Sequence, residues 1–207
     1  MRRVSLILAL APALATAPLR AQRALELGAL IGYYRPVGAF DPSNVVATGL
    51  AVRPQDLSGA AWGAEARLWL QPRWGVQLQG FTAGSRTPDV FTPGGCCSGA
   101  RARVTTITAQ GIHAFLGRGS TARVWLGVGP AVIRHGGDAY SRWGSPTSPG
   151  ASTSGGASAP LGNHLRVEVG AGATIYDFHV NSPQGGSLQS GVRKDLLLHV
   201  GLSWSSR

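Results

Sequence analysis

The sequence predicts an all-β protein: an eight-stranded antiparallel up-and-down transmembrane β-barrel, preceded by a cleaved signal peptide. Three observations predict this class. Helix signals are nearly absent from a chain with 30 glycines and 13 prolines. Apolar and polar residues alternate with period two, as in the stretch LRVEVGAGATIY at 165–176. Long and short connections between such stretches also alternate, as they do in an up-and-down barrel that crosses a membrane.

The N-terminus has the layout of a secretory signal peptide. Arg2 and Arg3 precede a mostly apolar run, and Leu19–Ala21 is a small-residue cleavage context. We therefore expect residues 1–21 to be a signal peptide and 22–207 to be one barrel domain. Removal of the leader lowers the net charge from +10 to about +7. Export argues against nucleic acid as a partner and favours anionic lipid or surface polymer.

Seven segments alternate clearly enough to be strands. They are Ala24–Tyr34, Ala60–Leu70, Trp74–Ala83, Arg103–Leu116, Thr121–Ile133, Leu165–Phe178 and Asp195–Trp204. The connections between them are of two kinds. Tight turns are predicted at Gln71–Arg73, Gly117–Ser120 and Gly162–His164, and long loops at Arg35–Gly59, Gly84–Ala102, Arg134–Pro149 and His179–Lys194.

The alternation of long and short connections requires an eighth strand. The strand at 121–133 runs toward the loop side, and so does the strand at 165–178, because a long gap follows each of them. A strand in the opposite direction must lie between them. We place it at Gly150–Leu161, although its glycine and serine content alone would indicate a linker.

The two faces of these strands differ, which indicates lipid outside and a polar lumen inside. The polar phase carries the residues that we assign to a lumenal ion-pair network: Glu26, Glu65, Arg67, Gln77, Gln79, Arg123, Arg166 and Glu168. Small glycines on the same phase suit the crowded interior of an eight-stranded barrel. Aromatic residues lie at both ends of the apolar face of the strands, as in the girdles of a membrane barrel. They are Tyr33, Trp62, Trp74 and Trp204.

An opposite arrangement of the faces is the first alternative. A soluble secreted barrel of lipocalin type would turn the aliphatic phase inward, around a ligand contacted by Val167, Val169 and their neighbours.

The C-terminal segment alternates from Leu196 to a terminal aromatic, Trp204. With GALIGYYRPVG near the start and LRVEVGAGATIYDF, the chain resembles the small outer-membrane β-barrel family that includes OmpA- and OmpX-type domains. The resemblance implies a bacterial outer-membrane location and recognition of the last strand by the barrel-insertion machinery. The chain departs from the family in its tail, Ser205-Ser206-Arg207, since the family usually ends on the aromatic itself.

No catalytic, metal or cofactor motif stands out, so we expect a non-enzymatic protein with a structural or surface-interaction role. The lumenal charges are then structural pairs, with a narrow ion path as the functional alternative. A lipid-modifying enzyme is a further alternative. His199 shares a face with Asp195 and Ser203, but four residues along a strand span about 13 Å. His113 beside a lumenal glutamate could still assemble a site across strands.

The predicted loops are rich in arginine, which suits outer-membrane lipid and anionic surface lipid or polysaccharide as partners. The loop arginines are Arg35, Arg53, Arg86, Arg101, Arg134, Arg142 and Arg193. Cys96 and Cys97 are adjacent, and their Cα atoms at about 3.8 Å are closer than a usual disulfide allows. No further ligand stands near them, so we interpret them as part of a loop. We expect a monomer.

Overall fold

A computed structural model describes residues 24–37, 58–86, 90–92, 95–97, 101–115, 122–137, 147–181 and 187–206. The predicted signal peptide and its cleavage point lie outside these residues. The strands are β1 (Ala24–Val37), β2 (Gly59–Trp69), β3 (Trp74–Arg86), β4 (Val90–Thr92), β5 (Gly95–Cys97), β6 (Arg101–Ala114), β7 (Arg123–Gly136), β8 (Thr147–Pro160), β9 (Leu165–Asn181) and β10 (Ser187–Ser205).

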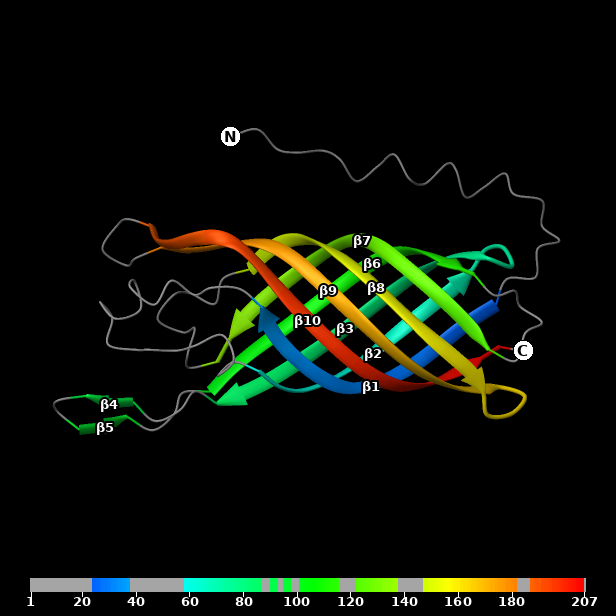
Figure 1. Cartoon of the computed structure of the whole chain (residues 1–207), viewed down its shortest axis with the longest axis horizontal. Helices are drawn as coiled ribbons and strands as arrows, with labels where there is room; N and C mark the ends of the chain where they lie inside the picture. The colour runs from blue at the N-terminus through cyan, green and yellow to red at the C-terminus, as the bar shows by residue number, and fades with distance from the viewer. Residues whose placement is uncertain are drawn as a thin grey trace, which may run out of the picture.

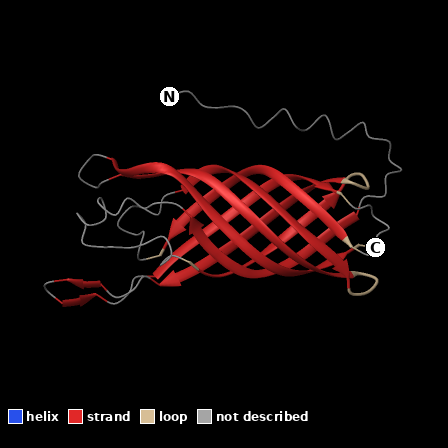
Figure 2. Cartoon of the chain, in the orientation of Figure 1, coloured by secondary structure: helices blue, strands red, loops and turns tan. Residues whose placement is uncertain are grey.

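Eight of these strands close into one antiparallel barrel, in the order β1-β10-β9-β8-β7-β6-β3-β2 and back to β1. β1 and β10 pair with each other and so close the barrel. Every other barrel strand lies between the barrel strands that precede and follow it in the chain. Figures 1 and 2 show the tilted wall, with the start of β1, the end of β10 and the tight turns at one end. The predicted fold class is confirmed. No helix that could span a membrane occurs in the described ranges.

The glycine- and serine-rich segment is strand β8, as the alternation of connections predicted. It pairs with β7 and β9 along most of its length. Its small residues are needed because large neighbours cover both faces. A Cβ on Gly155 would lie 2.6 Å from Leu126 Cδ2, and one on Gly156 would lie 3.1 Å from the Trp125 ring. The glycine- and serine-rich composition of β8 would by itself indicate a linker. Here it belongs to a strand that is packed under bulky side chains.

The strands extend further toward the loop side than the alternation suggested. The predicted loop His179–Lys194 is wrong over most of its length, because β9 continues to Asn181 and β10 begins at Ser187. Backbone pairing between these two strands sustains the extension. The predicted loop Gly84–Ala102 contains the short hairpin β4–β5, where Phe91 pairs with Cys96 and Val90 with Cys97. Figure 1 shows this hairpin beyond the end of the barrel.

The predicted loop arginines are also corrected. Five of them lie on strands, because the strands extend past their predicted ends: Arg35, Arg86, Arg101, Arg134 and Arg193. Arg53 and Arg142 lie outside the described residues.

The wall is apolar outside and polar inside. Val169 is 58% exposed and Leu198 is 60% exposed, whereas Glu168 and His199, one residue before and after them, are buried. The lipocalin-like alternative is therefore wrong, since Val167 and Val169 point away from the lumen. The four predicted girdle residues are exposed on the outer wall, Tyr33 and Trp62 toward the loops and Trp74 and Trp204 at the turn side.

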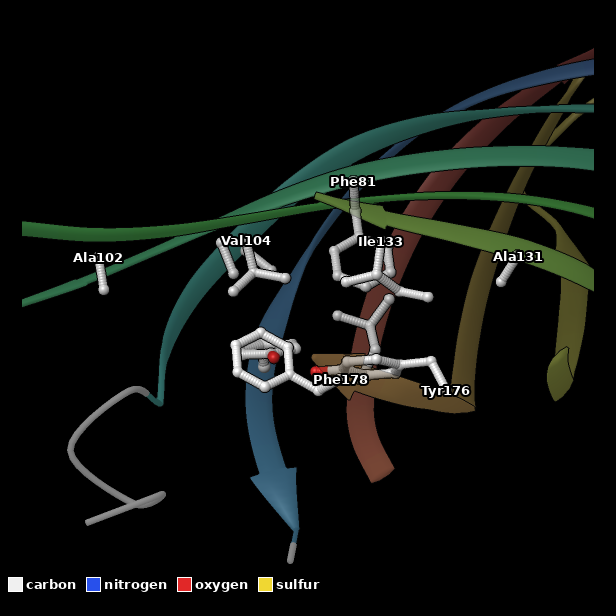
Figure 3. Close-up of a cluster of buried hydrophobic side chains, with 11 residues drawn as sticks. Phe81, Ala102, Val104, Ala131, Ile133, Tyr176 and Phe178 are labelled. Carbon is white, nitrogen blue, oxygen red and sulfur yellow. The ribbon is translucent and has the colours of Figure 1, made fainter. Parts of the chain in front are cut away.

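The loop-side half of the lumen is filled by apolar side chains. Figure 3 shows this cluster, in which Phe81, Ile133, Tyr176 and Phe178 converge from β3, β7 and β9. A smaller apolar cluster at the turn side contains Trp69 and Trp125. The lumenal arginines and glutamates lie in the turn-side half, whereas the buried Asp195 lies farther toward the loops.

Candidate functional site

The lumenal charges are centred on Arg67 of β2, which is 1% exposed. Its Nη1 donates to Glu168 Oε2 at 2.5 Å, and its Nη2 donates to Glu168 Oε1 at 3.0 Å and Glu65 Oε2 at 2.6 Å. Its Nε donates to Gln77 Oε1 at 2.9 Å. All three nitrogens of the guanidinium are thus engaged, two of them on the same carboxylate in the fork geometry that arginine favours.

This cluster connects strands that do not neighbour one another. Arg67 and Glu65 come from β2 and Glu168 from β9, and β1 and β10 separate these strands in the barrel order. The Arg67 guanidinium also lies 4.3 Å from the ring centre of Trp125, on β7. Because a buried charge must be paired, these contacts hold the Arg67 side chain across the lumen.

A second ion pair crosses the lumen nearer its turn-side mouth. Arg123 Nη1 donates to Glu26 Oε1 at 2.6 Å, and the Arg123 guanidinium lies 4.5 Å from the ring centre of Trp69. Arg123 belongs to β7 and Glu26 to β1, four strands apart in the eight-strand order. The structure therefore repeats one arrangement, an arginine that lies on a buried tryptophan and reaches a carboxylate across the barrel.

The remaining predicted lumenal residues, Arg166 and Gln79, form no ion pair or hydrogen bond with these two groups in the described part of the chain. Arg166 is half-buried and donates to the carbonyl oxygen of Ser158 at 3.1 Å. With Glu26 and Arg123 it lines a hollow of about 200 Å³ at the turn-side mouth. Gln79 is buried farther up the lumen, where its side-chain nitrogen has no hydrogen-bond partner among the described residues.

The middle of the lumen is nearly filled. Gln79 lines a cavity of about 10 Å³, which is the size of a single water. Gln110 lies beside it and joins two serines of β8: its Nε2 donates to Ser152 Oγ at 2.9 Å, and Ser154 Oγ donates to its Oε1 at 2.5 Å.

Neither His113 nor His199 belongs to a catalytic arrangement among the described residues. His113 lies on the outer wall, where its ring is 4.3 Å from that of Trp74, so its predicted pairing with a lumenal glutamate is wrong. His199 is buried inside, with Nε2 at 3.4 Å from Glu168 Oε1. Asp195 and Ser203 share its face, but no hydrogen bond joins either of them to His199 in the described part of the chain.

The sequence also contained signals for lumenal residues that the prediction left out. Trp69, Trp125, Gln110 and His199 occupy the same inward phase as the predicted charges. The alternation along each strand is enough to identify these side chains as facing the lumen. It does not show that each of the two tryptophans contacts an arginine, because those contacts cross the barrel.

Inward glycines give the ionic side chains room. A Cβ on Gly170 would lie 2.6 Å from His199 Cε1 and Nε2, and one on Gly201 would lie 3.2 Å from Glu168 Cγ. The crowding at Gly170 is tighter than real side chains tolerate. Small residues on β9 and β10 are therefore part of how the cluster is built.

Among the described residues, no group of three or more His, Cys, Asp or Glu side chains could hold a metal ion. The arrangement consists of paired buried charges, in which Glu65 Oε1 and Gln77 Nε2 have no hydrogen-bond partner among the described residues. Chemically it can hold the wall together and obstruct the lumen.

The fold was compared with known proteins. No family model and no curated protein matches the sequence. The barrel is similar to the crystal structure of Neisserial surface protein A, with a TM-score of 0.55 and 12% identity over 87% of this chain and 97% of that one. It is similarly close to the outer-membrane protein OprG from Pseudomonas aeruginosa, with a TM-score of 0.55 and 12% identity over 89% and 96% of the two chains.

These neighbours share the barrel fold that the strands of this chain build. The chain has the fold of the small outer-membrane β-barrels of OmpA and OmpX type, and its apolar wall with aromatic residues toward both ends places it in the bacterial outer membrane.

Proposed function

We propose that this protein is a non-enzymatic, non-conducting outer-membrane barrel, in which the sealed lumen is structural and the loop end is the surface that meets partners. One observation carries the proposal. Arg67 is held across the lumen by Glu65, Glu168 and Gln77 and is covered by Trp125. An ion that entered would have to displace a fully satisfied guanidinium, which removal from water makes costly.

The apolar cluster supports the same conclusion from the other end. Phe81, Ile133 and Phe178 occupy the loop-side half of the lumen. A solute entering from that end meets these side chains before it reaches Arg67. Both halves are thus obstructed, by charge pairs in one and by apolar side chains in the other.

An enzymatic role is less well supported by this arrangement. His199 is 3% exposed and lies inside the wall, and a lipid acyl group lies outside it. The nearest acidic group, Glu168, is already held by Arg67. For this reason we assign no catalytic residue.

The proposal extends to assembly and to partners. Apolar and polar residues alternate along β10 up to Trp204, and the insertion machinery would recognise this strand. The tail after Trp204 continues the wall at the turn side. Ser206 N donates to the Leu25 carbonyl at 3.0 Å, and Leu25 N donates to Ser206 Oγ at 3.2 Å. The two extra serines would then lengthen the closing seam between β1 and β10 and leave recognition of Trp204 intact.

The test is conductance of the purified mature protein in planar bilayers. A gel run with and without boiling first establishes a folded barrel, because a closed barrel keeps its compact form in detergent until it is heated. We expect a heat-dependent shift and no current steps above those of the bare bilayer. Discrete steps from the wild-type protein would contradict the sealed lumen.

A second test addresses the enzymatic alternative. Incubation of the protein with phospholipid should leave the acyl composition of the phospholipid unchanged. Acyl release that His199→Ala abolishes would instead indicate an enzyme.

A further inference from the structure

The hollow of about 200 Å³ at the turn-side mouth has the features of a binding site. Its walls come from the ends of β1, β7, β8, β9 and β10 and from the turn that joins β8 to β9. A water takes up about 30 Å³ in the liquid, so the hollow has room for a group as large as about six waters. Most of the lining residues are charged or polar, and the hollow therefore suits a small polar ligand.

Arg166, which lines this hollow, differs from the two buried lumenal arginines. Arg67 and Arg123 each contact a glutamate and lie on a tryptophan ring. Arg166 is half-buried, and its Nε and Nη2 donate only to neutral oxygens of Ser158. Its Nη1 forms no hydrogen bond, and its side chain no ion pair, within the described part of the chain. A cation that is partly removed from water is thus left without a counter-charge.

The charges around the hollow are unequal. Glu26 is the one carboxylate among the described residues that line it, and Arg123 Nη1 already donates to Glu26 at 2.6 Å. Two arginines against one glutamate leave a net charge of +1 on this lining, with His164 neutral. Removal of a charge from water is costly unless an opposite charge lies nearby. The hollow is therefore complementary to an anion from outside the chain.

The same charges favour a monoanion. A phosphoryl group carries a charge of about −1.5 to −2 at pH 7, and Glu26 in the same hollow would repel the additional charge. A carboxylate carries one negative charge, which equals the excess on the lining. It also accepts two hydrogen bonds from an arginine fork, as the carboxylate of Glu168 does from Arg67. A carboxylate is the better match.

The rim of the hollow is held in place by the protein itself. Asn163 and His164 are exposed at the turn between β8 and β9. His164 Nδ1 donates to the Ser205 carbonyl oxygen at 3.1 Å, and Ser205 N donates to the His164 carbonyl oxygen at 2.7 Å. A rim that is already ordered favours binding, because less conformational freedom is lost when a ligand arrives. In an outer-membrane barrel the short turns face the periplasm, which is therefore the side from which a ligand enters.

We propose that the turn-side mouth binds the carboxylate of a small periplasmic molecule, with Arg166 as the residue that holds it and Arg123 as the second positive charge beside it. A free organic acid and the terminus of a peptide both present this group. The proposal goes beyond the proposed function and takes from it only the orientation, with the turns in the periplasm. The pair of Arg123 and Glu26 lines the hollow, so binding there requires no passage through the lumen.

The experiment is a titration of the mature barrel in uncharged dodecylmaltoside micelles, followed by NMR through the backbone amide signal of Gly162. The probes are propionate and N-acetyl-Ala-Ala, which represent the two sources of the carboxylate. We expect a saturable shift with at least one of them, and the one that saturates identifies the source. No saturable shift with either probe would overturn the site.

Two further probes test which chemical group is recognised. N-acetyl-Ala-Ala amide lacks the carboxylate and should give no saturable shift, so binding equal to that of the free acid would overturn recognition of a carboxylate. Inorganic phosphate should bind more weakly than the better carboxylate, because Glu26 repels its additional charge. Tighter binding of phosphate would overturn the assignment to a carboxylate.

Two variants test the residues. Arg166→Gln should raise the Kd more than about tenfold, because hydrogen bonds from a charged donor are the strong ones. Asn163→Asp changes an exposed turn residue, so it preserves the wall, and its negative charge at the rim should raise the Kd about threefold or more. Unchanged binding by either variant would overturn the site.

The matched control is Arg73→Gln. Arg73 is exposed in the turn between β2 and β3, which lies at the same end of the barrel but on the opposite side from β8 and β9 in the strand order. We expect its Kd to stay within about threefold of the wild type, because salt screens a charge at that separation. Weakening equal to that of Arg166→Gln would overturn the site in favour of a diffuse surface charge.

The heat-dependent gel shift and the bilayer conductance are measured on the same samples. A variant that shifts on heating and does not conduct is a folded, sealed barrel. Loss of carboxylate binding in that background therefore tests the mouth site separately from the proposed function.

Discussion

The two halves of the lumen are filled by different chemistry. In the turn-side half, Arg67 and Arg123 reach glutamates on the far wall and lie on Trp125 and Trp69. In the loop-side half the packing is mostly apolar, and Phe178 is typical of it. One half depends on charge pairs that are costly to break, and the other on the fit of side chains. An eight-stranded lumen can therefore be filled in either way, and the two halves should differ in their sensitivity to substitution.

The largest effect should follow from Arg67→Ala. The change leaves Glu65 and Glu168 buried without their common partner, and breaking a buried pair in this way costs about 3–5 kcal/mol. Equilibrium urea unfolding in phospholipid vesicles measures the free energy of unfolding. The triple variant Arg67→Ala, Glu65→Gln and Glu168→Gln should lose less than Arg67→Ala alone. A triple variant that is less stable than Arg67→Ala would show that the charge pairs do not determine the stability contributed by the turn-side half.

The apolar half should respond to lost volume. Ile133 is 0% exposed, so Ile133→Ala should lower the free energy of unfolding by about 2–5 kcal/mol, and Ile133→Val by only about 0.5–1.5 kcal/mol. The same unfolding titration measures both. Equal losses in the free energy of unfolding from the two variants would mean that the volume of the cavity does not determine the loss. The contrast between an apolar half that depends on packing and a charged half that depends on ion pairs would then fail.

A smaller effect should follow from Gly170→Ala on β9. The new methyl group would crowd His199, and overpacking of this kind costs about 1–3 kcal/mol. His199→Ala should relieve the crowding, so the double variant should be more stable than the sum of the single losses predicts. Additive losses would indicate that Gly170 matters for its backbone and not for the room it leaves.

The smallest effect is expected on the outer wall. Val128 is 68% exposed, so Val128→Ala removes contacts with lipid and leaves the lumen unchanged. We expect a change within about 0.5 kcal/mol. A loss as large as that of Ile133→Ala would show that the outer wall contributes packing of its own, and lumenal effects would have to be measured against it.

Most of the wall could be predicted from the sequence. Period-two alternation distinguishes the two faces of each strand, and a one-residue error would reverse them. The alternation of long and short connections located β8 despite its glycine and serine content. The strand ends on the loop side were less predictable, because β9 and β10 continue through backbone pairing where the alternation of side chains no longer shows it.

The number of barrel strands, the direction of each face and most of the inward charged residues follow from the alternation in the sequence. Which of these residues meet follows only from the assembled barrel. Arg67 and Glu168 are far apart in the chain and are joined by the closure of the barrel, which no local pattern encodes. The same holds for Arg86 and Arg101, which lie opposite each other on β3 and β6 because strand register sets which residues are paired. Alternation is a local property of each strand, whereas partner choice depends on closure and register, and these belong to the assembled sheet.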